Sequence, residues 1–292
     1  MRFLALVCLA VANLLSFPSW CADSHTDVEH LLKRASKGDV DAEFMLGLAY
    51  EKGRGVAQDF AEAARWYQKA GDAGSAGAQT NLGNLYLKGK GIACDEAMAL
   101  RWYLRAAVQG HATAQTNVGF MYFNGKGGVT RDYAEAARWF AKAAEQHEPF
   151  GEANLASLYA HGQGVERDLG RAAKLYLSAA RHGNMLAQSV IAWMYEHGIG
   201  VSPDLAESLR WYKTAAERGS PQALNNLGYL YEHGEGMPRD LALAAKYFRQ
   251  AAELGLSEAR YNLDILLSNG EGETRASAEA SGLDGGNGGI HH

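Results

Sequence analysis

Cysteine and proline are both scarce in this chain of 292 residues, which has three cysteines and five prolines. Cys8 lies in an N-terminal segment that we expect to be removed, so only Cys21 and Cys94 could remain. That number excludes a disulfide framework. Few prolines suit long helical stretches, because proline breaks helix interiors. The fold must therefore be stabilised by packing.

An excess of positive charge is also absent. The formal net charge is −5 and the isoelectric point is about 6.1. Neither value favours binding to nucleic acid or to an anionic membrane surface, which attract basic proteins. Hydrophobic residues make up 47% and charged residues 21%, so the main body is expected to be globular.

The apolar run at the N-terminus is too short to span a membrane, which takes roughly 20 residues. Residues 1–22 instead predict a signal peptide, with basic Arg2, an apolar stretch Phe3–Leu15 and small residues before a polar segment. We expect export to the periplasm or secretion, with no membrane insertion after cleavage. The cleavage point stays open, as does a lipid on Cys21, which the bulky Trp20 fits poorly.

A repeat of about 36 residues runs through the rest of the chain. An aromatic pair recurs at steps of 36, 37, 36, 36 and 36 residues, at Trp66-Tyr67, Trp102-Tyr103, Trp139-Phe140, Leu175-Tyr176, Trp211-Tyr212 and Tyr247-Phe248. A small-residue series has the same period, at Gly47, Gly83, Gly119, Ala156, Ala192, Gly228 and Asp264. A tyrosine series and a Gly-x-Gly series recur with the same period. Such periodicity is typical of a solenoid.

Each unit is predicted to form two helices. The Gly-x-Gly pair ends the first helix, and an aspartate such as Asp59 caps the second. Glu62, Glu135 and Glu207 stand three residues after their caps and predict capping boxes. The second helix ends at a glycine in every unit except one, where His147 takes its place. The small residues allow close helix approach, and the large aromatics fill the gaps between units.

These patterns predict an all-α solenoid of six two-helix repeats with half-repeat caps. We expect an N-terminal capping helix in residues 23–37 and the solenoid in residues 38–268, including a lone first helix at its end. Residues 269–292 are rich in Gly, Ser and Glu and are expected to be a flexible tail.

The repeat unit resembles the Sel-1-like repeat, a relative of the tetratricopeptide repeat. The resemblance rests on residues 78–86, Gly89-Lys90-Gly91-Ile92 and residues 102–107, and it extends over residues 38–272. It implies a right-handed α-solenoid that serves as a protein-binding scaffold, mainly in bacteria when exported. Ala156, Ala192, Asp264 and Leu175 depart from the pattern, which suggests looser packing or a bend in the fourth unit.

No catalytic constellation and no cofactor motif is found in the sequence. His161, His197 and His233 occupy equivalent positions, but helices about 8–10 Å apart separate them too widely to share a zinc ion with bonds of about 2.1 Å. We therefore expect no metal site. One family branch, rich in disulfides, is linked to β-lactam binding or hydrolysis. The chain lacks its paired cysteines, so a β-lactam or cell-wall hydrolase stays the alternative function.

The concave face of a solenoid is the usual place for a partner. By analogy with tetratricopeptide stacks, the residues one and four positions after the small-residue series should point into it, together with some residues three positions before. The predicted partner-binding residues are Asn84, Phe120, Phe123, Trp193, Glu196, Tyr229, Glu232 and Tyr261. The alternative is that the aromatics among them belong to the core. The function predicted is a non-catalytic interaction scaffold or adaptor in the bacterial envelope or outside the cell, as a regulator, an assembly factor or a toxin-immunity protein.

Overall fold

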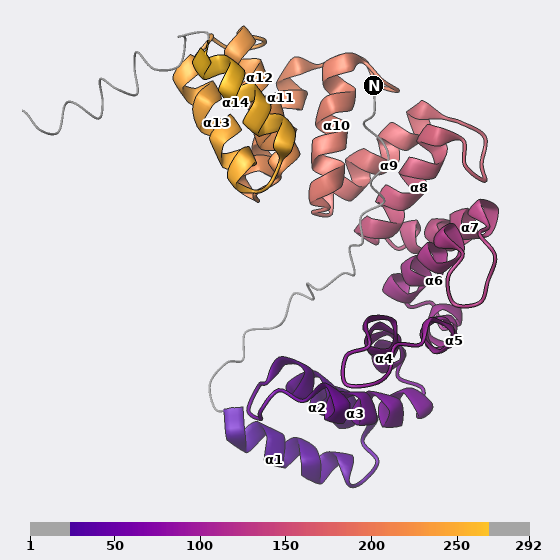
Figure 1. The fold of residues 1–292 in the computed structure, drawn as a ribbon. Coiled ribbons are helices and arrows are strands. Elements are labelled where there is room, and N and C mark those ends of the chain that lie inside the picture. Colours follow the sequence, from indigo (N-terminus) through magenta and orange to yellow (C-terminus); the bar gives the residue numbers. More distant parts are fainter. Residues whose placement is uncertain (1–23, 269–292) are drawn as a thin grey trace, which may run out of the picture. The chain divides into compact units, whose positions relative to one another are not determined.

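The computed structural model describes residues 24–268, which form fourteen helices and no strand (Figure 1). The helices are α1 (Ser24–Ala35), α2 (Val40–Lys52), α3 (Phe60–Asp72), α4 (Ala76–Lys88), α5 (Glu96–Val108), α6 (Ala112–Asn124), α7 (Tyr133–Ala144), α8 (Pro149–His161), α9 (Leu169–Arg181), α10 (Met185–His197), α11 (Leu205–Glu217), α12 (Pro221–His233), α13 (Leu241–Glu253) and α14 (Ser257–Ser268). The predicted all-α fold is confirmed. The predicted signal peptide and tail lie outside the described residues.

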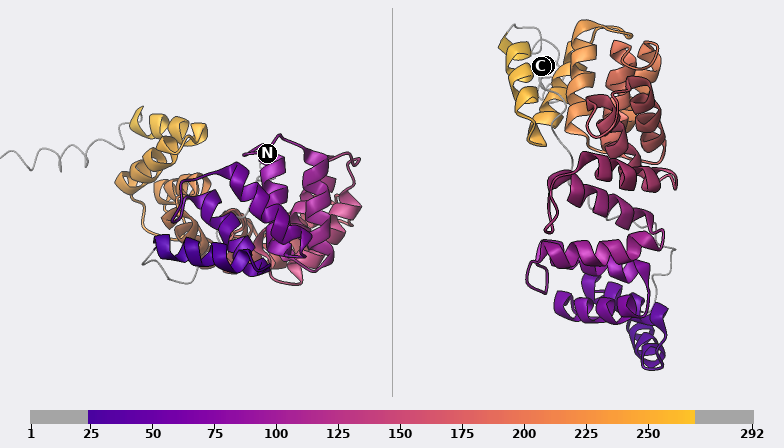
Figure 2. Two further views of the ribbon diagram at one scale, coloured as in Figure 1. Left: turned by 90° about the horizontal axis from the view of Figure 1, so that it is seen from below. Right: turned by 90° about the vertical axis from the view of Figure 1, so that its right-hand side faces the viewer.

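Six helix pairs follow one another along the chain, from α2–α3 to α12–α13, with α1 and α14 as single helices before and after them. The chain divides into unit 1, which holds α1–α9, and unit 2, which starts at Gly183 and holds α10–α14. Within unit 1, α4 and α6 lie on one side of the stack and α5 and α7 on the other (Figure 1). The right-hand view of Figure 2 shows the pairs of this unit stacked one on the next. No described helix is long and apolar enough to cross a membrane.

The two residues of each aromatic pair pack in different directions. Tyr103 is buried against Gly83 of its own repeat, where an added Cβ would lie 2.6 Å from the ring. Trp102 is also buried, and its ring packs against Gly71 of the preceding repeat. The small residue therefore allows close approach within a repeat, and the tryptophan fills the space between repeats.

The predicted aspartate caps are present, but the predicted capping boxes are wrong. The Asp59 carboxylate accepts hydrogen bonds from the backbone N–H groups of Ala61 and Glu62. The Asp59 N–H, which a capping box would require to be free, donates to the Tyr50 carbonyl at 2.9 Å. The equivalent bond recurs in all six repeats. Glu62 consequently pairs with Arg65 instead, at 3.0 Å, and Glu135 and Glu207 likewise pair with arginines three residues on.

The helix ends follow the predicted glycines. Gly53 ends α2 at φ 67°, a left-handed conformation that glycine adopts without strain. Second helices end near glycines of positive φ, such as Gly110. His147 stands at one of these positions with φ 58° and is the single non-glycine residue with positive φ among residues 24–268.

Candidate functional site

Buried tyrosines in unit 1 reach through their repeats to polar groups on the first helices. The Tyr67 hydroxyl in α3 donates to Glu51 Oε2 in α2 at 2.6 Å. In the next repeat, the Tyr103 hydroxyl donates to Asn84 Oδ1 in α4 at 2.7 Å. Burial raises the pKa of both tyrosines, so both stay neutral donors. The tyrosines therefore hold Glu51 and Asn84 in fixed orientations, and we call the surface formed by such first-helix residues the first-helix face.

A small basic pocket opens beside these two residues. Its volume is about 140 Å³, and its lining includes Glu51, Asn84 and three lysines, Lys52, Lys88 and Lys90. Burial lowers the pKa of Lys88, and the charge of Lys90 lowers it further. Glu51 forms an ion pair with Lys52 at 2.9 Å. The pocket thus has a positive excess that suits an anionic group.

Unit 2 repeats the tyrosine contact and adds aromatic groups. The Tyr212 hydroxyl donates to Glu196 Oε2 at 2.8 Å. Burial raises the pKa of Glu196, although the Tyr212 hydrogen bond opposes this effect. The ring centroids of Trp193 and His197 are 4.8 Å apart. Tyr229 stacks on His233 at 4.1 Å and is 45% exposed, so a large aromatic side chain faces solvent here.

The other predicted binding residues differ in their surroundings. Phe120 and Glu232 are partly exposed. Phe123 contacts Tyr133 edge-on at 5.1 Å and packs against the core of its repeat, so it is partly a core residue. Tyr261 is 66% exposed, but its equivalents Thr116 and Asn225 are buried. Thr116 bonds to the residue that caps the next first helix, so the exposure of Tyr261 follows from its place in the last described helix.

Sequence reasoning missed a recurring asparagine two positions before the small residue. Asn81 interacts with the Tyr67 hydroxyl, and Asn226 with that of Tyr212. Asn117 donates to Asn84 Oδ1 at 3.5 Å, which links the first helices of two repeats. The signal was available in the sequence as a series, at Asn81, Asn117, Asn154, Asn226 and Asn262.

The histidine series of the sequence has a structural role. Nδ1 of His161, His197 and His233 lies 2.7, 3.1 and 2.9 Å from the carbonyl oxygen four residues earlier. Each imidazole therefore bonds to the last turn of its own helix.

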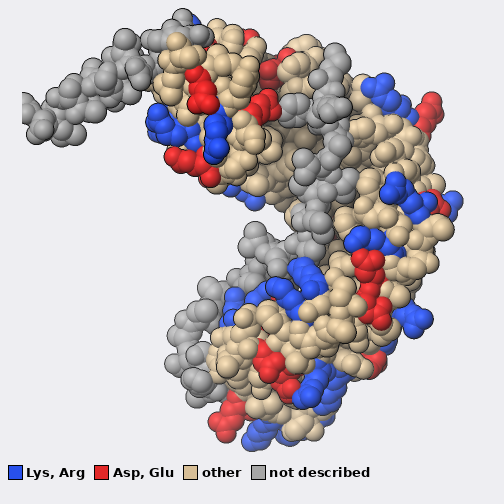
Figure 3. All heavy atoms as spheres, in the orientation of Figure 1, with Lys and Arg blue, Asp and Glu red and all other residues tan. Residues whose placement is uncertain are grey.

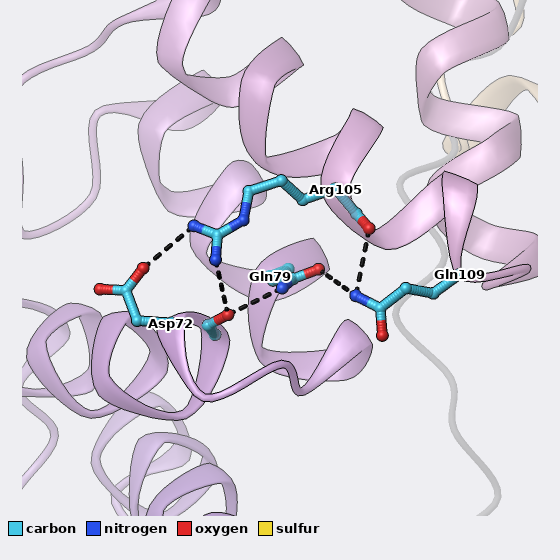
Figure 4. Close-up of polar contacts among 5 residues, drawn as sticks. Asp72, Gln79, Arg105 and Gln109 are labelled. Atoms are coloured by element: carbon cyan, nitrogen blue, oxygen red, sulfur yellow. Dashed lines mark hydrogen bonds and ion pairs between the residues drawn. The ribbon is translucent and has the colours of Figure 1, made fainter.

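Hydrogen bonds also join consecutive repeats away from this face (Figure 4). Gln79 donates to the Gly71 carbonyl at 2.7 Å and accepts from Gln109 at 2.8 Å. Arg105 donates to the same carbonyl and pairs with Asp72 at 3.0 Å. Charged groups of both signs are mixed on the surface seen in Figure 3.

The stacked helix pairs and the polar first-helix face define a repeat scaffold. The chain belongs to the Sel1 repeat family, whose repeats match residues 40–75, 76–111, 112–147, 149–184, 186–220 and 221–256. Repeats of this family generally serve as protein-interaction scaffolds. A comparison with curated proteins finds no match.

Many solved structures are similar to the chain. One is c5321, described as a protective antigen present in uropathogenic Escherichia coli strains, with 37% identity and a TM-score of 0.75 over 88% of this chain. The match covers 55% of that protein, so the chain corresponds to about half its length. Another is a Sel1 repeat protein from Oxalobacter formigenes, with 30% identity and a TM-score of 0.67, covering 77% of this chain and 96% of that one.

Proposed function

We propose that the protein is a non-catalytic scaffold that binds a partner protein on its first-helix face. The observation that carries this proposal is the set of polar groups on that face held by buried tyrosines. Glu51, Asn84 and Glu196 each accept a hydrogen bond from a tyrosine of the same repeat. Groups already fixed in position lose little conformational entropy when a partner binds.

The exposed aromatic side chains of unit 2 supply the apolar part of such a surface. Tyr229 is 45% exposed, and Trp193, at the equivalent position of the preceding first helix, is partly exposed. Tyrosine and tryptophan are the residues that most often dominate the binding energy of protein interfaces. We expect them to anchor the partner, while the polar groups determine its orientation.

The basic pocket of unit 1 indicates which group of the partner it receives. Its volume of about 140 Å³ is smaller than the roughly 300–1,000 Å³ of a small-molecule site. It suits a single side chain, and Lys52, Lys88 and Lys90 favour a negative one. We therefore expect an acidic side chain or a C-terminal carboxylate of the partner at this place.

The location that we propose is the bacterial periplasm or the extracellular space. Support comes from the signal-peptide pattern of residues 1–22 and from the two bacterial relatives. The identity of the partner then decides whether the protein acts as a regulator, an assembly factor or an immunity protein.

Site-specific photo-crosslinking in the native bacterium tests the binding face. A photoreactive amino acid at position 84 or 229 should crosslink one and the same partner protein. The matched controls are Arg101 and Lys213, which are exposed on second helices. Equal crosslinking from the control positions would contradict the proposed face. Turnover of β-lactams or cell-wall fragments by the purified protein would contradict the non-catalytic role.

A further inference from the structure

The contact between the two helices of one repeat differs from its equivalents at several positions at once. The common arrangement, seen in Figure 4, pairs a buried glutamine in a first helix with a polar residue at the end of the following second helix. Gln115 and Gln146 repeat it at 2.8 Å. In repeat 1 the residue at the glutamine position is a glutamate, Glu43. Its carboxylate forms an ion pair with Lys69 at 2.9 Å, which neutralises its charge.

The fourth repeat replaces these groups with a different set. Glu152 stands at the glutamine position in α8, and His182 stands at the end of α9. Ser178 occupies the place that Lys69 and Arg105 occupy in earlier repeats. The glutamate is 2% exposed, and none of its ion-pair partners among residues 24–268 is a lysine or an arginine. A buried carboxylate is costly unless a cation neutralises it.

Two imidazoles face this carboxylate. Nδ1 of His147 lies 3.3 Å from Glu152 Oε1, and Nδ1 of His182 lies 3.1 Å from Oε2. The two rings are 5.0 Å apart, and the ligand atoms of the three residues all lie within 4.8 Å of one another. Tetrahedral zinc with bonds of about 2.0–2.1 Å places its ligand atoms roughly 3.3 Å apart. Each imidazole nitrogen lies at about this distance from one carboxylate oxygen, His147 from Oε1 and His182 from Oε2.

The backbone at His147 adds an independent observation. The equivalent residues are Gly74, Gly110, Gly183, Gly219 and Gly255, all with positive φ. Histidine at φ 58° is strained in a conformation that glycine adopts freely. Backbone strain of this kind clusters at functional sites. Here it brings an imidazole to the buried carboxylate.

We propose that His147, Glu152 and His182 form a binding site for a divalent late transition-metal ion, of which Zn²⁺ is the natural occupant. Two imidazole nitrogens and one carboxylate suit zinc better than magnesium or calcium, which prefer oxygen ligands. The Ser178 hydroxyl donates to Glu152 Oε1 at 2.6 Å and orients the carboxylate. The side chains of His147 and His182 are 70% and 40% exposed, which leaves a path for the ion and a coordination position open to water.

The site joins α8 to the end of α9, so an ion bound there links the two helices of the fourth repeat. This role is separate from the partner-binding face, and it departs from our sequence-based expectation of no metal. That expectation considered His161, His197 and His233, whose spacing is fixed by the repeat. The present cluster arises from residues that break the repeat pattern.

Zinc titration of the full chain tests the proposal, with calorimetry and thermal unfolding as readouts. We expect one Zn²⁺ per chain and a higher melting temperature, with no effect of Mg²⁺. His147→Gly, Glu152→Gln and His182→Gln restore residue types that other repeats carry, so they should fold normally by circular dichroism. Each should weaken zinc binding by roughly tenfold or more. Ser178→Ala should weaken it by roughly 10–100-fold through loss of an outer hydrogen bond.

Two control variants identify adventitious binding. His233→Gln removes an exposed histidine outside the cluster, and His291→Ala with His292→Ala removes the histidines at the C-terminus. Both controls should bind zinc as the unmodified chain does. The proposal is overturned if zinc does not bind at micromolar concentration, if the three cluster variants still bind it, or if binding is lost with His291 and His292.

Discussion

At the scale of single residues, each repeat depends on two different close contacts. The tyrosine of the aromatic pair lies against the small residue of its own first helix, and the tryptophan lies against the preceding repeat. Trp102 is 5% exposed and belongs to a core cluster with residues of α3 in the preceding repeat and α4 in its own. The Arg105 guanidinium lies 4.3 Å from the centre of its ring. Substitutions at these two kinds of position should therefore destabilise the fold for different reasons.

Trp102→Ala is expected to create a cavity between two repeats. Large-to-small substitutions of buried aromatics cost about 3–5 kcal/mol of unfolding free energy. Urea unfolding followed by circular dichroism measures this loss. A cost below about 1 kcal/mol would show that the tryptophan is not a core residue.

Gly83→Ala is expected to cause a clash. The new Cβ would lie 2.6 Å from the Tyr103 ring and 3.2 Å from the Ala99 carbonyl oxygen. We expect a loss of about 1–3 kcal/mol, as for other overpacked cores. Ala156→Gly is the matched reverse change, and it should cost no more than about 1 kcal/mol through lower helix propensity. An unchanged stability of Gly83→Ala would refute the close-approach role of the glycine.

At the scale of helices, capping shows what the sequence revealed and what it did not. The second-helix caps could be predicted because aspartate recurs in all six repeats. The first-helix caps are equally regular in structure, but their residue types differ, at Asp39, Ser75, His111, Glu148, Asn184 and Ser220. A period search detects identical residues and misses a shared role carried by different ones.

His111 makes one of these caps sensitive to pH. Its Nδ1 accepts a hydrogen bond from the Ala114 N–H and lies 3.1 Å from Thr80 Oγ1. Burial lowers the pKa of His111 below its ordinary 6.5. The imidazole therefore takes up a proton less readily in the folded chain than in the unfolded chain, where its pKa is about 6.5. As the pH falls from about 6.5 through the lower pKa of the folded state, proton uptake favours the unfolded chain and stability is lost.

His111→Ser supplies the matched test, because Ser75 and Ser220 cap equivalent helices. We expect the unfolding free energies of the two chains to be similar at pH 7.5. At pH 5.5 the unmodified chain should have lost more stability than His111→Ser. Equal losses in both chains would contradict the pH-sensitive cap.

At the scale of the whole molecule, the repeat period determined the fold but not the contacts of the first-helix face. The number and type of helices followed from residues that recur at one spacing. The hydrogen bonds from Tyr67 to Glu51 and from Tyr103 to Asn84 join residues 16 and 19 positions apart. The bond from Tyr212 to Glu196 keeps the spacing of 16, but in the repeat of Tyr103 the acceptor stands three positions earlier, so one spacing does not predict all three bonds. The cluster of His147, Glu152 and His182 likewise becomes visible only in three dimensions.

The exposed fraction of each side chain distinguishes candidate partner-binding aromatics from core aromatics, which the sequence alone does not. Tyr229 projects from α12 and is 45% exposed, whereas Phe123 packs partly into the core. Replacing Tyr229 should therefore cost little stability, and its effect on binding can be measured without loss of the fold. The Trp193 side chain is less exposed, so its replacement is the weaker test.

The most direct test of the scaffold function is the affinity of Tyr229→Ala for the partner identified by crosslinking, with Lys213→Ala as control. If the protein is such a scaffold, Tyr229→Ala keeps a melting temperature close to that of the unmodified chain. Its binding should weaken by about 2 kcal/mol or more, the usual loss at a hot spot, with no loss for Lys213→Ala. Unchanged affinity of Tyr229→Ala, or a large fall in stability with binding per folded molecule intact, would contradict it.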